Sequence, residues 1–105
     1  MLTRQDIEWL EARGAKLKEH EYVLENGHFV VRVHETNKAD GTKGVCCCVA
    51  VTDTGLADPG TIYVCIRDTL KSALGMAMQV MTTRWGRMAQ AMRAMEEFDK
   101  DLKGQ

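Results

Sequence analysis

The sequence predicts an α+β fold: a four-stranded antiparallel meander (α-β-β-β-β-α), with a short N-terminal helix and a long C-terminal helix packed on one face. Three observations predict it. The dipeptide Asn26-Gly27 separates two alternating runs, the strongest short-range signal for a β-hairpin. Two further apolar runs of strand length follow, and the last third of the chain carries apolar residues at helical spacing. The length of 105 residues predicts one domain, 1–105.

The first helix is predicted from its two ends. Thr3 and Asp6 have the spacing of a capping box, with Asp in place of the usual Glu. Gly14 suits the left-handed residue that follows a helix C-terminus. We therefore expect a helix from about Arg4 to Arg13 with one buried face.

A two-residue loop at Asn26-Gly27 sets the register of the first hairpin. It pairs Glu25 with His28 and Leu24 with Phe29. Side chains alternate between the two faces of a strand, so the register assigns every residue of the hairpin to a face. The apolar face collects Tyr22, Leu24, Phe29, Val31 and Val33.

The next two strands are predicted from their apolar patterns. Gly44 to Thr52 is apolar on both faces, a pattern typical of an interior strand. Thr61 to Arg67 alternates, and we expect its larger aliphatic side chains to face the core. These side chains are Ile62, Val64 and Ile66.

The last third, Thr69 to Leu102, reads as one long helix with a Met-rich seam. One row of the seam repeats every seven residues and a second row is offset by threes and fours. The rows are Leu74, Met81, Met88, Met95 and Leu102, and Met78, Trp85 and Met92. One rod of this length measures about 50 Å, more than a short strand covers. A break at Trp85-Gly86, giving a helical hairpin, is the alternative.

Composition excludes several classes of function. The net charge of −1 argues against a protein whose affinity depends on phosphates or anionic lipid. Charges in the first dozen residues exclude a signal peptide, and no uncharged run is long enough for a membrane span. We expect a cytoplasmic protein with reduced thiols and no membrane association.

The contiguous cysteines Cys46, Cys47 and Cys48 do not have the spacing of a disulfide framework or of a zinc motif. If Thr52 pairs with Thr61, Cys48 lies opposite Cys65. A metal or thiol site that uses Cys46, Cys48 and Cys65 is the alternative to buried structural thiols. We predict structural thiols, with no metal and no cofactor.

Nothing in the chain meets the requirements of an active site. The sequence has no Gly-rich phosphate loop, nucleophile elbow or metal-binding helix motif. His20, His28 and His34 have no local partner signature for acid–base work, and ordinary surface pairing explains them. The chain is therefore predicted not to be an enzyme.

By element order alone, the chain is similar to two kinds of small α+β module, double-stranded RNA-binding domains and dimeric secretion chaperones. As a compact α+β protein with an unusual tail, it also resembles small phage-encoded inhibitors such as anti-CRISPR proteins. The RNA-binding modules begin their last helix with a lysine-rich segment. In this chain the corresponding segment is Thr69-Leu70-Lys71-Ser72-Ala73, which is not lysine-rich.

These observations predict a non-enzymatic protein-interaction module or inhibitor. It binds a protein partner, or itself as a homodimer, through the Met/Trp-rich C-terminal helix, because Met is suited to surfaces that adapt to a partner. The predicted contact residues are Arg84, Trp85, Arg87, Met88, Met92 and Met95. One alternative is nucleic-acid binding through Arg84, Arg87 and Arg93, and the other is a thiol- or metal-dependent function of the cysteines.

Overall fold

A computed structural model provides the three-dimensional structure. It describes residues 1–25, 29–51, 62–84 and 89–104, and of residues 84 and 89–93 it describes the backbone alone.

Within these residues the chain forms three helices and five strands. They are α1 (Arg4–Ala12), β1 (Lys16–Lys18), β2 (Glu21–Glu25), β3 (Phe29–Asn37), β4 (Lys43–Val51), β5 (Ile62–Arg67), α2 (Leu70–Arg84) and α3 (Ala89–Lys103). The strands form one antiparallel sheet in chain order, β1-β2-β3-β4-β5. The predicted α+β meander is confirmed, with the three-residue β1 as an additional edge strand.

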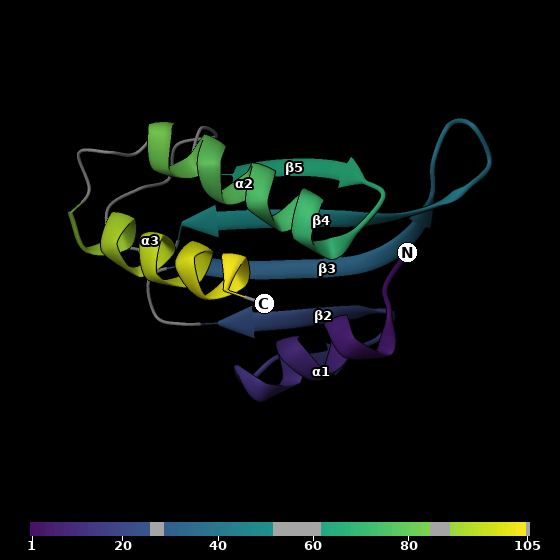
Figure 1. The fold of residues 1–105 in the computed structure, drawn as a ribbon, viewed down its shortest axis with the longest axis horizontal. Helices are drawn as coiled ribbons and strands as arrows, with labels where there is room; N and C mark the ends of the chain where they lie inside the picture. Colours follow the sequence, from purple (N-terminus) through teal and green to yellow (C-terminus); the bar gives the residue numbers. More distant parts are fainter. Residues whose placement is uncertain (26–28, 52–61, 85–88, 105) are drawn as a thin grey trace.

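The core lies between one face of the sheet and the three helices. Figure 1 shows α2 crossing β4 and β5, α3 over β3, and α1 at the β2 side. Residues of all three helices and of one sheet face join a single buried cluster. Its largest fully buried side chains include Leu10, Phe29, Val31, Val49, Leu70, Leu74, Met78, Met81, Met95 and Leu102. Helices therefore cover one face of the sheet, as predicted.

The predicted ends of α1 are confirmed. The Thr3 hydroxyl accepts a hydrogen bond from the Asp6 amide (3.1 Å), and the Asp6 carboxylate accepts one from the Thr3 amide (3.0 Å). Gly14 has a φ of +96°, a backbone conformation that glycine adopts without steric cost. This cap fixes where α1 begins and directs its buried residues Trp9 and Leu10 toward the sheet.

The register of the first hairpin differs from the prediction by two residues. Glu25 pairs with Val30 and Leu24 with Val31, so more than two residues connect β2 and β3. Asn26 and Gly27 lie outside the described residues. A shift of two leaves every side chain on its predicted face, and Phe29 is accordingly buried with Val31.

The register of β4 and β5 differs by one residue, which reverses the faces of β5. Cys47 pairs with Cys65, and Cys48 with Val64. The prediction that Ile62, Val64 and Ile66 face the core was therefore wrong. Both faces of β5 are apolar, so its pattern does not select one. In the structure the Cys65 thiol lies under α2 and donates a hydrogen bond to the Ala73 carbonyl (3.1 Å).

The predicted long C-terminal helix is two helices. α2 ends at Arg84, α3 begins at Ala89, and the two pack against each other on one face of the sheet (Figure 1). A continuous rod of about 50 Å would exceed the longest dimension of the molecule, 37 Å. Folding back lets both helices share one core, which is the helical-hairpin alternative. The residues 85–88 that connect them lie outside the described residues.

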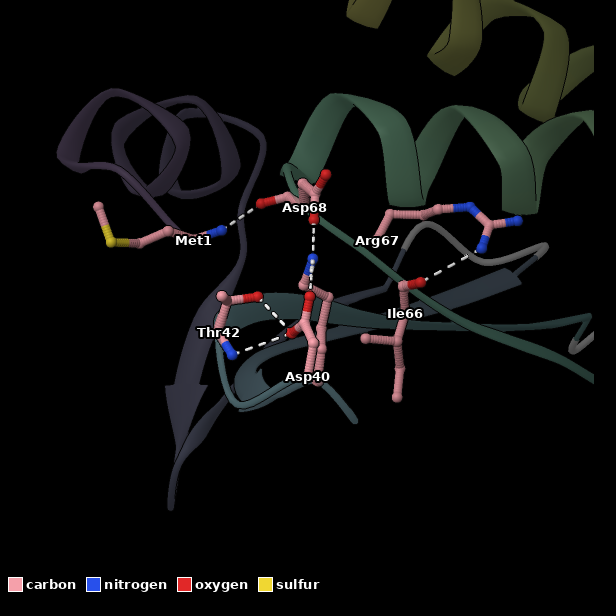
Figure 2. A network of polar contacts seen from close by, with 7 residues as sticks. Met1, Asp40, Thr42, Ile66, Arg67 and Asp68 are labelled. Atoms are coloured by element: carbon pink, nitrogen blue, oxygen red, sulfur yellow. Dashed lines mark hydrogen bonds and ion pairs between the residues drawn. The ribbon is translucent and has the colours of Figure 1, made fainter.

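A polar network holds the junction of β5 and α2 (Figure 2). The Asp68 carboxylate binds the Lys38 ammonium, and the Asp68 carbonyl accepts a hydrogen bond from the Met1 amino group. Asp40 accepts hydrogen bonds from the hydroxyl and the amide of Thr42. The Asp68 carboxylate raises the pKa of Lys38, and the two Thr42 donors lower the pKa of Asp40. The end of β5 is thereby tied to the β3–β4 loop and to the chain start.

Candidate functional site

Of the six residues predicted to form a contact surface on the C-terminal helix, the structure describes the side chain of one, Met95. Met95 is fully buried in the core, where it holds α3 against the sheet and is not available at the surface. Trp85, Arg87 and Met88 lie outside the described residues. Arg84 and Met92 lie within α2 and α3, but their side chains are not described. For these five residues the contact surface stays a prediction.

The apolar seam is core wherever the structure describes its side chains. Leu74, Met78, Met81, Met95 and Leu102 are each at most 1% exposed. Met95 and Leu102 belong to the same buried cluster as Phe29 and the sheet residues. The seam therefore packs the helical hairpin onto the sheet, which is the ordinary role of an apolar stripe at helical spacing.

The exposed apolar surface lies instead on β5. Ile62, Val64 and Ile66 are 50%, 54% and 44% exposed and point away from the helices. Half-buried residues of β4 lie beside them on the same face. We call this set the β5 patch: Cys46, Cys48, Ala50, Ile62, Val64 and Ile66. Such a contiguous apolar group at the surface marks an interaction site more often than scattered apolar residues do.

The register extends this face in three rows across the sheet. They are Val30–Ala50–Ile62, Arg32–Cys48–Val64 and His34–Cys46–Ile66. At the β2–β3 side the face carries charged side chains beside Val23 and Val30, and Arg32 forms an ion pair with Glu21 (2.7 Å). The face is thus apolar at β4 and β5 and polar toward β2, so an apolar partner surface fits at one side of it.

The two edges of the sheet have opposite character. β1 has three exposed residues, two of them lysines, and short lysine-rich edges discourage pairing with another chain. β5 has six residues, its single charge is Arg67 at the end, and it contains no proline. Among the described residues its one strand partner is β4. Within the described residues, β5 therefore lacks the short length, the lysines and the proline that discourage strand addition at an edge.

Sequence reasoning missed the β5 patch because it placed Ile62, Val64 and Ile66 in the core. A signal for the patch was nevertheless present. β4 is apolar on both faces, and helices were expected on one face only. The second apolar face of β4, at Cys46 and Cys48, therefore required either a cover or exposure to solvent.

The four cysteines divide between the two faces of the sheet. Cys47 and Cys65 are buried opposite each other on the core face, and Cys46 and Cys48 are half-buried on the other. The suggested grouping of Cys46, Cys48 and Cys65 on one face was therefore wrong. Burial raises the pKa of all four thiols, furthest for Cys47, so they are mostly protonated and weakly nucleophilic at neutral pH.

We expect stability to fall as the pH rises above about 9, the ordinary pKa of a thiol. A thiol with a raised pKa in the folded state keeps its proton there while the unfolded chain releases it. For Cys47 the loss approaches about 1.4 kcal/mol per pH unit. Urea unfolding between pH 7 and 10.5 measures it. Cys47→Ala should show a flatter pH dependence than the wild type, and an identical pH dependence of the two proteins would contradict this origin.

Two hollows lie outside the β5 patch. One, of about 480 Å³, is lined by Trp9, Arg13, Glu97, Lys100, Asp101 and Gly104. Its Arg13 stacks on Trp9 (4.0 Å from the guanidinium carbon to the ring centroid) and pairs with Asp101, so its guanidinium is already engaged. The other, of about 310 Å³, is lined by Glu19, His20, Glu21 and His34.

Among the described residues, no group of three or more His, Cys, Asp or Glu side chains is arranged to hold a metal ion. In the same part of the chain, no helix combines the length and apolar character that crossing a membrane requires.

Comparison with protein-family models, curated proteins and solved structures gives no match to this chain. The class that its fold defines is a small α+β domain with an antiparallel five-stranded sheet, helices on one face and an apolar edge strand, counted over the described residues.

Proposed function

We propose that the chain is a small, non-enzymatic protein-interaction module that binds a protein partner through the β5 patch. The observation that carries the proposal is the row of three half-exposed aliphatic side chains, Ile62, Val64 and Ile66, on an edge strand. An inhibitor that acts by covering its target is one form of such a module. The contacts predicted for Trp85, Met88 and Met92 stay a separate prediction.

The energetics favour contact of this face with a partner. Complete burial of an aliphatic side chain contributes about 1.5–3 kcal/mol, and half of each side chain is still exposed here. Covering the three side chains therefore contributes about 3 kcal/mol in total. A partner strand that pairs with β5 would add main-chain hydrogen bonds, as in β-strand addition.

A matched pair of variants tests the surface. Val64→Lys places a charge in the centre of the β5 patch, and Leu17→Lys places the same charge on β1, where Leu17 is 60% exposed. In affinity capture from an extract of the source cells, Leu17→Lys should retain the proteins bound by the wild type. Val64→Lys should lose them or reduce them at least tenfold. Equal capture by the two variants would contradict the proposed surface.

Folding of both variants is checked by circular dichroism and urea unfolding. Both positions are more than half exposed, so each substitution should change the free energy of unfolding by less than about 1 kcal/mol. Loss of binding by Val64→Lys then reports the surface and not the stability of the domain.

A further inference from the structure

We propose that the partner which covers the β5 edge is a second copy of this chain, with the two β5 strands pairing antiparallel about a two-fold axis. The two five-stranded sheets would then form one continuous sheet. This inference rests on the proposed function, because it names the occupant of the edge strand that carries the β5 patch. The inference follows from four observations: the residues at the two edges of the sheet, the side-chain rows of β5, the charge of β5 and the position of α2.

The two edges of the sheet explain why pairing involves β5 with β5. β1 is three residues long and carries Lys16 and Lys18, so it is a poor partner for any strand. Copies joined head to tail, β5 on β1, would bring these lysines into the junction and would also build an open filament. Pairing of β5 with itself uses only the apolar edge and closes after two copies.

The geometry of the two-fold axis limits the register. An axis perpendicular to the sheet puts the helices of both copies on one side and the two β5 patches on the other. Residues opposite each other must then point to the same face, so a residue pairs with itself at the axis. Centring on Val64 places Val64 opposite its own copy and Ile62 opposite Ile66 of the second copy. The two rows of aliphatic side chains join into one stripe.

This register keeps like charges apart. Arg67 is the only charged residue of β5. Centred on Val64, the two Arg67 residues lie six residue steps apart along the strands, about 20 Å at about 3.3 Å per residue. That distance exceeds the screening length of about 8–10 Å in physiological salt. Each copy has a net charge of −1, so overall repulsion between copies is small.

The position of α2 permits the same arrangement. α2 packs on both β4 and β5 (Figure 1), so its axis lies about one strand spacing, about 5 Å, inside the proposed junction. The two copies of α2 would then be about 10 Å apart, the distance at which helices pack. The Ala73 carbonyl accepts a hydrogen bond from the Cys65 thiol of β5, and the half-buried Met76 and Val80 lie three and seven residues further along α2.

The size of this interface sets its strength. A standard stable interface takes about 20–30 residues and about 800 Å² from each partner. One six-residue strand and one edge of α2 supply fewer residues than that. We therefore expect a dimer that dissociates in the micromolar range, and one that a competing partner strand can displace.

The first test is the molar mass of the full chain by light scattering and sedimentation from about 1 to 500 μM. The wild type and Leu17→Lys should change from the monomer mass of 11.8 kDa to twice that value with the same midpoint. Val64→Lys should remain a monomer or raise the midpoint at least tenfold. A wild type that stays monomeric throughout, or a Val64→Lys variant that dimerises like the wild type, overturns the inference.

Disulfide cross-linking tests the register. Cys46 and Cys48 are first replaced by Ala, because Cys48 lies opposite Val64 within one chain. In this background Val64→Cys should form a covalent dimer under mild oxidation by dioxygen with a copper catalyst. Ile62→Cys should not, since the two copies of residue 62 lie about 13 Å apart and a disulfide spans less than about 7 Å. The opposite pattern overturns the Val64-centred pairing.

The two proposals fail differently. If the wild type is a monomer and Val64→Lys loses the captured proteins, the dimer is contradicted and the interaction surface is supported. A dimer that Val64→Lys does not affect, together with unchanged capture, removes both.

Discussion

Replacing Met95 by Asp is expected to unfold the protein. Met95 is a residue of α3 and is fully buried in the core. Removing its packing costs about 2–5 kcal/mol, and a carboxylate at this position would be buried without a partner, which adds to the cost. A domain of this size has a total stability of about 5–15 kcal/mol. Circular dichroism and urea unfolding should therefore show loss of at least about 4 kcal/mol or a largely unfolded chain.

Glu96→Ala is the matched control for Met95→Asp, because Glu96 is the exposed neighbour on α3. It should change the free energy of unfolding by no more than about 0.5 kcal/mol. A Met95→Asp variant with wild-type stability would show that α3 does not dock in solution. If that variant also lost protein partners, Met95 would belong to the contact surface predicted on the C-terminal helix.

Replacing Phe29 by Ala is expected to cost about 3–5 kcal/mol. Phe29 is fully buried on β3 and meets Phe98 of α3 edge-on, with ring centroids 5.7 Å apart. Phe98 in turn meets Trp9 of α1 edge-on at 5.3 Å. This chain of three rings joins the sheet to the first and last helices, so the truncation opens a cavity where all three meet. Urea unfolding gives the change directly.

Phe29→Leu separates loss of volume from loss of the aromatic contact. It retains most of the buried volume and should cost about 1–1.5 kcal/mol. A cost below about 1 kcal/mol for Phe29→Ala would mean that the aromatic chain does not join the helices to the sheet.

The sequence was sufficient to predict the structure in two situations. One was where contacts within a few residues decide it, and the other was where the alternation of side chains along a strand decides it. Thr3, Asp6 and Gly14 specify the two ends of α1 through hydrogen bonds and backbone conformation within a few residues. The residues of β2 and β3 were assigned to the correct faces although the predicted register was wrong by two residues, because side chains alternate with a period of two. Phe29 could therefore be placed in the core without knowing its cross-strand partner.

The register of β4 and β5 could not be predicted, because the connection is long and both faces of β5 are apolar. Tyr63 and Cys65 compete with Ile62, Val64 and Ile66 for the core. In the structure α2 packs on β4 and β5 with Cys65 on its side of the sheet, where the Cys65 thiol donates a hydrogen bond to the Ala73 carbonyl. Contacts of this kind join separate elements and are not visible in the pattern of β5 alone. The alternatives on Arg84, Arg87 and Arg93 concern side chains outside those described, and they stay predictions.

Because the strands of the sheet lie in chain order, we expect folding in two steps, with the sheet forming early and the first and last helices docking late. Each strand pairs with its neighbour in sequence, so the sheet forms from contacts between consecutive segments of the chain and can form early. The contact of Arg13 with Asp101 spans 88 residues and joins the first helix to the last. Docking of the two chain ends is then the late step, and substitutions at Arg13 should accelerate unfolding more than they slow folding.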